Sequence, residues 1–182
     1  MTKLTVVYLK DTGHVLAALT RANPPQGTEH VSALVGTGLP VRFIGRFQAD
    51  ATVPAQDLDL ATVDDQPRVV TSPQSFKVTV DAKRQAQVTS AGAASQITLA
   101  ITKTSGATVT GATTQMPARV GLQKVGTSSS LAPTNLNPVT VGPGAGGTVV
   151  AGPAGFVPGD TWNMYVLVQG LQPTVQQLTV PP

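Results

Sequence analysis

The sequence predicts an all-β protein, and three observations support this prediction. Helical periodicity is absent: every ten-residue window with apolar residues at helical spacing also contains glycine, proline or a run of β-branched residues. Short alternating or β-branched stretches recur along the chain, and turn-forming residues separate them. The chain has only one Trp, two Tyr and four Phe, so its core must consist mainly of small branched side chains. At 182 residues it can form one large or two small domains.

The first predicted element is a β-hairpin. Residues 4–9 and 14–20 are mainly apolar, and the turn-forming residues 10–13 separate them. Asp11 can accept hydrogen bonds from backbone amides in this turn, and Gly13 can adopt a positive φ angle. Residues 23–27 follow as a predicted loop, because Pro24 and Pro25 lack backbone donors.

Four more strands are predicted before residue 72. Residues 30–35 and 39–45 are expected to pair through a glycine-rich turn, and residues 68–71 are expected to form a short strand. Residues 57–63 alternate weakly and are predicted to be an edge strand. This stretch and the next two residues hold the only acidic cluster, Asp57, Asp59, Asp64 and Asp65. Carboxylates can bind Ca²⁺, but no calcium-loop pattern is present, and charge on an edge strand also blocks sheet-to-sheet pairing. We favour the second interpretation.

A boundary is predicted at residues 72–75, where the acidic character of the chain ends. We therefore expect a small β domain over residues 1–72 and a second β domain over residues 75–182. The second region contains strands predicted at residues 76–80, 85–89, 96–102, 107–110, 119–125, 139–141, 148–151, 162–169 and 175–180. Loops are predicted at residues 126–138 and 142–147. Strands at this spacing indicate a sandwich or a barrel.

The sequence Pro-Gly-Asp-Thr-Trp-Asn-Met-Tyr-Val-Leu-Val at residues 158–168 resembles the E–F turn and F strand of immunoglobulin-like and fibronectin III-like domains. Residues 175–180 resemble the terminal G strand. Trp162 stands near the head of the F-like strand, where the family usually has Tyr, and the chain has no cysteine pair. The resemblance implies an immunoglobulin-like β-sandwich over residues 75–182. It concerns architecture and does not imply a function.

Catalytic and metal sites find little support in the sequence. His14 and His30 are the only histidines and there is no cysteine, so thiolate chemistry is excluded. His14 is expected to be a structural residue beside a hairpin turn. Glu29 and His30 are adjacent, so on a strand they would point to opposite faces and could not easily share a metal ion. The glycine-rich residues 142–147 lack the Lys-Ser/Thr of a phosphate-binding loop. We predict no catalytic, cofactor or metal site.

The chain carries unusually little charge. Charged residues make up 12% of it, against roughly 25% in an ordinary soluble domain, and residues 85–182 hold only Lys103, Arg119, Lys124 and Asp160. A neutral surface can contact protein without desolvating ions. We therefore expect a non-enzymatic structural or interaction protein, a subunit of a particle or filament such as a phage-tail-like assembly, that contacts copies of itself or other proteins.

A carbohydrate- or cell-surface-binding module is the alternative. It would need an exposed aromatic ring with amide side chains nearby, and Asn163, Tyr165 and Gln169 are the candidates. Because Trp162 and Tyr165 are three residues apart on a strand, one is expected in the core and the other on the surface; we place Trp162 in the core.

Nucleic acid is not an expected partner, since Lys77, Lys83 and Arg84 are the only loose basic cluster. No stretch has the length of a membrane span or a secretory signal, so we expect synthesis in the cytoplasm, with release inside a particle as one route out of it.

Overall fold

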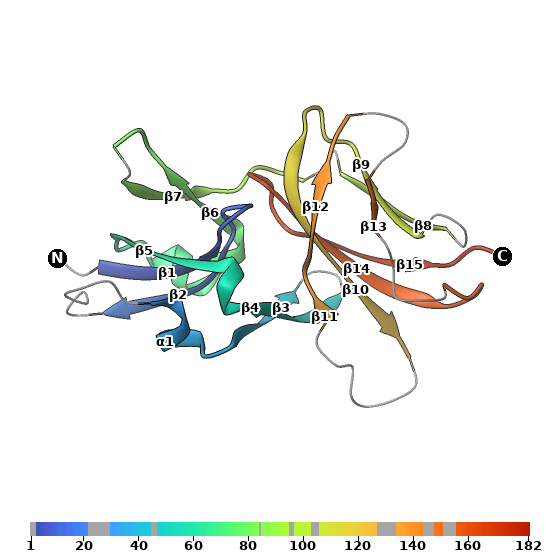
Figure 1. The fold of residues 1–182 in the computed structure, drawn as a ribbon, viewed down its shortest axis with the longest axis horizontal. Helices are drawn as coiled ribbons and strands as arrows, with labels where there is room; N and C mark the ends of the chain where they lie inside the picture. Colours follow the sequence, from blue (N-terminus) through green and yellow to red (C-terminus); the bar gives the residue numbers. More distant parts are fainter. Residues whose placement is uncertain are drawn as a thin grey trace. The chain divides into compact units, whose positions relative to one another are not determined.

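The computed structural model of the chain describes residues 3–21, 30–44, 47–83, 85–94, 97–102, 106–126, 134–143, 148–150 and 156–182. These residues are mainly in β-strands, as predicted, with two short α-helices (Figure 1). The strands are β1 (Lys3–Leu9), β2 (Val15–Arg21), β3 (Gly38–Ile44), β4 (Gln48–Pro54), β5 (Leu58–Asp64), β6 (Phe76–Val80), β7 (Ala86–Ser90), β8 (Thr98–Thr102), β9 (Gly106–Thr110), β10 (Met116–Val125), β11 (Thr134–Asn135), β12 (Asn137–Val141), β13 (Thr148–Val150), β14 (Thr161–Val168) and β15 (Thr174–Thr179). The helices are α1 (Val31–Val35) and α2 (Pro67–Thr71), and the 3-10 turns are η1 (Ala55–Asp57) and η2 (Pro73–Ser75).

The described strands form five small sheets. Antiparallel pairing builds the sheets β2-β1-β5, β12-β10-β14-β15 and β13-β9-β8, and the two-stranded sheet β6-β7. The fifth sheet has the order β11-β4-β3, and its β11–β4 pair is parallel. All nine strands predicted after residue 75 are present, and their bounds differ from the expected ones by no more than three residues.

The chain folds into two compact units. The first comprises Met1–Leu39, Val53–Gly92 and Gln169–Gln172; the second comprises Pro40–Thr52, Ala93–Val168 and Pro173–Pro182. Neither unit is one continuous segment of chain. The predicted division into residues 1–72 and 75–182 stays a prediction, which fragments of the chain can test.

In the first unit, β1 is the central strand of its sheet and is buried on both faces. Leu4 and Val6 belong to a core cluster with Val63 of β5 and with Val78 and Val88 of the β6–β7 hairpin. The other face of β1 is buried as well, at Val7 and Leu9. β1 pairs with β2 from Lys3↔Arg21 to Tyr8↔Val15, which confirms the predicted first hairpin.

Gly13 lies at a tight contact in the turn of this hairpin. Its φ angle is 76°, and a Cβ atom there would lie 2.7 Å from the carbonyl oxygen of Val78. The approach is close because the Val78 N–H donates to the Gly13 carbonyl at 2.8 Å, which ties the turn to β6.

We expect Gly13→Ala to lower the free energy of unfolding by about 3 kcal/mol, since backbone strain and steric overlap add. Urea denaturation measures the loss. Gly36→Ala is the matched control, because Gly36 has a φ angle of 65°, yet a Cβ atom there would meet no neighbouring side chain or backbone within 4 Å. That change adds backbone strain without steric overlap, since φ 65° and ψ −127° lie outside the regions that alanine favours, and it should cost about 2 kcal/mol. Equal losses at the two glycines would contradict the importance of the Val78 contact.

The strand predicted at residues 30–35 is wrong, because Val31–Val35 forms α1. The Ala33 N–H donates to the His30 carbonyl and the Gly36 N–H to the Ser32 carbonyl. Gly36 then ends the helix with a positive φ angle. A five-residue apolar run fits one helical turn as well as a strand, so periodicity could not separate the two.

The short strand predicted at residues 68–71 is also wrong, because Pro67–Thr71 forms α2. Pro67 stands in the first turn, where its missing N–H costs nothing, and Val69 is the one buried residue of the helix. The edge strand predicted at residues 57–63 is confirmed as β5, which pairs with β1 along Leu58–Asp64 and lies at the edge of its sheet.

Strand β4 was not expected from the sequence. Only Ala51 and Val53 among its described side chains are buried apolar residues, and Pro54 follows directly, so its alternating pattern is short. The predicted loop at residues 23–27 lies outside the described residues, as do residues 127–133 and 144–147 of the two later loops. The end of the loop predicted at residues 126–138 is wrong, because β11 and the first two residues of β12 lie there.

In the second unit, β14 is the central buried strand. Six of its residues are at most 6% exposed: Trp162, Met164, Tyr165, Val166, Leu167 and Val168. Tyr165 lies directly opposite Gly121 of β10, and a Cβ atom at Gly121 would overlap the tyrosine ring. The same ring stacks on Phe43 of β3, with ring centroids 5.2 Å apart and an angle of 24° between the ring planes. The ring is thus packed between a glycine and a second aromatic side chain.

A row of amide side chains crosses the same sheet. Gln123 of β10 pairs with Asn163 of β14, and Asn163 pairs with Gln177 of β15. The Gln177 amide donates to Asn163 Oδ1 at 3.1 Å. Gln123 Oε1 accepts the N–H of Asp50 at 3.3 Å, and the Asn163 amide donates to the Gln48 carbonyl at 3.1 Å. Uncharged side chains therefore satisfy backbone groups of β4.

Candidate functional site

His14, in the turn of the first hairpin, is fully buried. Its Nε2 lies 2.7 Å from the Leu171 carbonyl oxygen and its Nδ1 lies 2.9 Å from Thr12 Oγ1. A carbonyl only accepts, so we assign the proton to Nε2, and Nδ1 accepts from the Thr12 hydroxyl. Both ring nitrogens are used within the first unit, and this geometry fits a structural role.

Burial lowers the pKa of His14 from 6.5 to about 4. The Leu171 carbonyl and the charge of Asp11 raise this pKa, and the charge of Lys77 lowers it further, but burial has the largest effect. Between these values the unfolded chain binds a proton that the folded chain does not. The contribution of the neutral His14 imidazole to the free energy of unfolding is therefore complete above about pH 6.5 and is lost as the pH falls toward 4. The gap corresponds to about 3 kcal/mol.

The comparison of wild type with His14→Gln isolates this contribution. We expect the difference between their free energies of unfolding to shrink by about 3 kcal/mol from about pH 7 to about pH 4. Urea denaturation at several pH values measures it. A difference that stays constant over this range would contradict a buried neutral imidazole.

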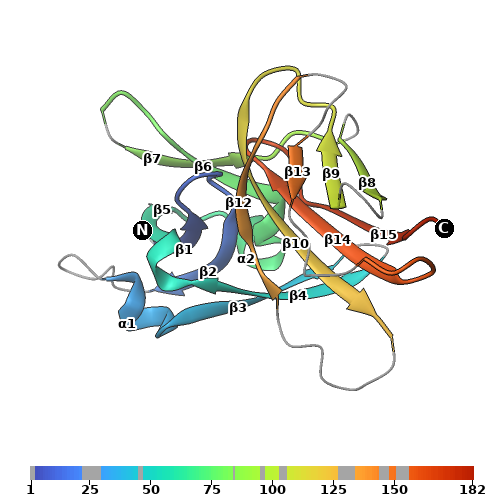
Figure 2. The same ribbon diagram turned by 45° about the vertical axis from the view of Figure 1, so that its right-hand side comes forward.

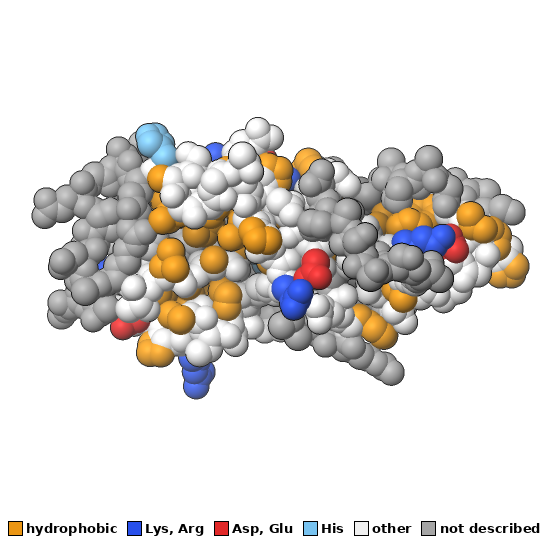
Figure 3. Space-filling model, turned by 90° about the horizontal axis from the view of Figure 1, so that it is seen from below, with side chains coloured by type: hydrophobic (Ala, Val, Ile, Leu, Met, Phe, Trp, Pro, Cys, Tyr) orange, Lys and Arg blue, Asp and Glu red, His pale blue; other side chains and the backbone are white. Residues whose placement is uncertain are grey.

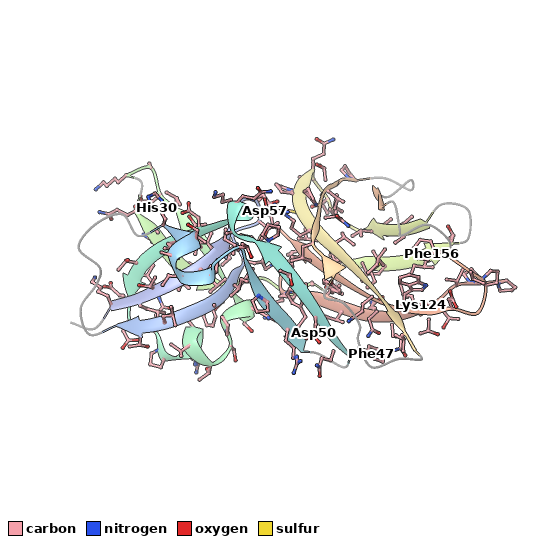
Figure 4. The ribbon with its side chains drawn as sticks, turned by 60° about the horizontal axis from the view of Figure 1, so that its bottom comes forward. His30, Phe47, Asp50, Asp57, Lys124 and Phe156 are labelled. Atoms are coloured by element: carbon pink, nitrogen blue, oxygen red, sulfur yellow. The ribbon has the colours of Figure 1, made fainter. Side chains whose placement is uncertain are left out.

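His30 is exposed at the start of α1 (Figure 4). It lines a shallow hollow of about 310 Å³ together with Ser32 and Asp59. A nucleophile, its base and an orienting acid must be joined by hydrogen bonds. The Asp59 carboxylate instead accepts from the Leu60 N–H at 2.8 Å and the Tyr8 hydroxyl at 3.3 Å. Among the hydrogen bonds of the described residues, none joins His30 to Ser32 or Asp59.

The four clustered aspartates have separate environments along β5. Asp64 forms an ion pair with Lys3 at 2.6 Å, and this hydrogen bond lowers the pKa of Asp64. Asp57 lies in η1 (Figure 4), where its carbonyl accepts the Lys10 N–H at 3.1 Å. Asp65 is exposed. Within the described residues, no three acidic or histidine side chains lie close enough together to hold a metal ion.

The three candidate ligand-binding residues do not form an exposed platform. The expected exposure of Tyr165 is wrong: the residue is 1% exposed, because both faces of β14 are covered. Asn163 uses its amide to bind Gln48 and Gln177. Gln169 is exposed but belongs to the first unit, whereas Asn163 and Tyr165 belong to the second. Trp162 is 6% exposed and packs edge-on against Phe156, as expected for a core residue.

Most charged residues of the second unit that the structure describes are paired. Lys124 contacts Asp160 at 2.6 Å, and Arg42 contacts Asp50 at 2.8 Å. Figure 3 shows blue and red side chains lying next to each other on a face that is otherwise mainly white and orange where it is described. Arg119 is buried and donates to the Leu136 carbonyl at 3.2 Å.

The edge strands of the first unit carry features that discourage pairing with another strand. β5 carries Asp59 and Asp64. The Asp59 carboxylate also binds the N–H of Leu60. On β7, the carbonyl of Val88 accepts a long hydrogen bond of 3.5 Å from the Gln66 amide. Charge and occupied backbone groups are common protections of sheet edges.

The second unit differs at two of its sheets, β12-β10-β14-β15 and β13-β9-β8. Their edge strands are β8, β12, β13 and β15, and none of these contains a charged residue. In the remaining sheet, β11-β4-β3, the edge strand β3 carries Arg42. Sequence reasoning identified the neutral composition of this region but did not identify the edges. The signal was present as the uncharged stretch of residues 174–179 between Pro173 and Pro181.

Comparison with protein-family models, curated proteins and solved structures finds no match to this chain. None of the described helices has the length and apolar character needed to cross a membrane.

Proposed function

We propose that this chain is a non-enzymatic structural or interaction protein and serves as a subunit of a larger protein assembly, a particle or a filament. The observation that carries the proposal is that all four edge strands of the sheets β12-β10-β14-β15 and β13-β9-β8 are uncharged. Soluble monomers commonly protect such edges with charge. Neutral edges can pair with another strand without desolvating ions.

We also propose that the second unit is an immunoglobulin-like sandwich, and strand order supports this. Strands β8, β9, β10, β12, β13, β14 and β15 can be lettered A, B, C, C′, E, F and G in chain order. Their sheets then read A-B-E and C′-C-F-G, which resembles the arrangement of fibronectin III-like domains. Contacts of β8 with β15 and of β12 with β13 bring the edges of the two sheets together (Figure 2). Modules of this kind serve many roles, so the edge chemistry carries the functional argument.

The glycan-binding alternative has less support. Sugar recognition would need an exposed aromatic ring, and among the described residues the exposed large hydrophobic side chains are Leu19, Val70, Val80 and Val157. None of these is aromatic. A glycan array that gives a strong signal, abolished by a substitution in this chain, would favour the alternative.

Light scattering after size exclusion tests the proposed function. The protein is analysed from micromolar to near-millimolar concentration, alone and after mixing with the products of the neighbouring genes. We expect a mass of several chains in at least one of these samples. A monomer in all of them would contradict the proposal.

A further inference from the structure

We propose that the chain self-associates through the outer edge of β15, the edge that does not pair with β14, by antiparallel pairing with the same edge of a second copy, centred on Gln177. This inference rests on the proposed function. It adds which strand pairs, with what, and in which register.

Strand β15 is the best candidate among the described edges. It is six residues long, and it contains no charge, proline or glycine. The other edges are less suitable: β12 contains Pro138, β3 contains Pro40 and Arg42, β13 has only three residues, and β8 is shorter, with five residues. Proline and charge are typical blocks to edge pairing. β8 of the other sheet contacts β15, but no described strand pairs with the outer edge of β15.

The hydrogen bonds at the end of the strand show which backbone groups point outward. The Val180 N–H donates to the Asp160 carbonyl at 2.8 Å, so residue 180 faces β14. Backbone direction alternates along a strand, and residues 178, 176 and 174 therefore also face β14. The N–H and C=O groups of Val175, Gln177 and Thr179 then point to the outer edge.

Two prolines limit this row of donors. Pro173 and Pro181 occupy the next outward positions, and proline has no N–H. The outward donors are thus confined to residues 175, 177 and 179, a set that is symmetric about Gln177. A second copy turned by a two-fold axis through Gln177 places residue 175 opposite residue 179 of its partner.

This register uses every outward donor. Gln177 lies opposite Gln177 of the second copy, and Val175 of each copy lies opposite Thr179 of the other. Each of these three pairs exchanges two backbone hydrogen bonds, so about six form. A register shifted by two residues would place Pro173 or Pro181 opposite an outward-facing carbonyl group, which would then have no N–H donor. The side chains are compatible as well, since Val175 and Thr179, which lie opposite each other, are both β-branched, and no charge is involved. The edge is therefore complementary to itself, which is why a second copy is the occupant.

A charge exchange at Gln177 tests the proposal. Gln177 is exposed, so Gln177→Lys and Gln177→Glu should fold normally, as circular dichroism can verify. Each variant alone places like charges directly opposite each other, and its self-association should weaken at least about tenfold. An equimolar mixture of the two should recover the wild-type mass in light scattering, because the charges are then opposite.

Two controls separate charge from other effects. Gln177→Leu removes the same hydrogen bond to Asn163 without adding charge, and it should keep the wild-type mass. Thr140→Lys changes an exposed residue on the opposite edge strand, β12, and it should also keep that mass.

The outcomes distinguish this inference from the proposed function. If the wild type self-associates and the two charged variants do so equally well, or if their mixture stays monomeric, the pairing through β15 is overturned and the proposed function stands. If the wild type is monomeric alone but assembles with other proteins, the pairing through β15 is again overturned and the proposed function stands. If it assembles in neither case, both are overturned.

Discussion

Gly121→Ala is expected to destabilise the protein by about 3 kcal/mol or more, or to prevent folding altogether. A Cβ atom at residue 121 would overlap the ring of Tyr165, which is 1% exposed. The ring has little room to move away, because Phe43 stacks against it. Thermal and urea denaturation of the purified variant measure the loss.

Gly142→Ala is the control for this substitution. A Cβ atom at Gly142 would lie 3.5 Å from Cγ of Gln115, which is ordinary van der Waals contact. Its effect should stay within about 0.5 kcal/mol. A double-mutant cycle adds a second check: Tyr165→Ala alone should cost about 4 kcal/mol, and adding Gly121→Ala to it should cost far less than in the wild type. Additive losses would contradict the packing of the ring on Gly121.

Fragments that separate residues 1–72 from residues 75–182 are expected not to fold by themselves. The longer fragment lacks Pro40–Thr52, which belongs to the second unit and supplies Phe43. It also keeps Val78 and Val88 without Leu4 and Val6, their core neighbours. We expect poorly dispersed amide signals in NMR spectra and no cooperative thermal transition for either fragment.

A nicked chain is the matched control. A protease site introduced at residues 72–75 and then cleaved breaks the backbone at the same place but leaves all segments present. The nicked protein should keep its dispersed spectrum, with a lower melting temperature. If residues 75–182 alone were as stable as the whole chain, the predicted domain division would be confirmed and the importance of Pro40–Thr52 would be contradicted.

Strand periodicity predicted most of the fold because the longer strands have clear boundaries. Gly and Pro punctuate the C-terminal region, and the predicted strands appear there close to their expected bounds. The errors occur at short segments. Residues 31–35 and 67–71 each bury at most one side chain, so neither a two-residue nor a 3.6-residue period could be recognised in five residues.

Burial of Tyr165 could not be predicted from β14 alone. The alternation rule places Trp162 and Tyr165 on opposite faces, and this is correct, but it does not reveal that both faces are covered. The cover over Tyr165 includes Phe43, which is more than a hundred residues away in sequence. The outward positions of β15 likewise depend on the hydrogen bond between Val180 and Asp160, which the sequence does not show.

Amide hydrogen exchange, followed residue by residue at low and high protein concentration, tests the central claim most directly. The amides of residues 174, 176 and 178 face β14 and should exchange slowly at both concentrations. Those of Val175, Gln177 and Thr179 should exchange fast in dilute solution and become protected when the chains associate. Fast exchange at these three amides in the fully associated protein would contradict pairing through the edge of β15.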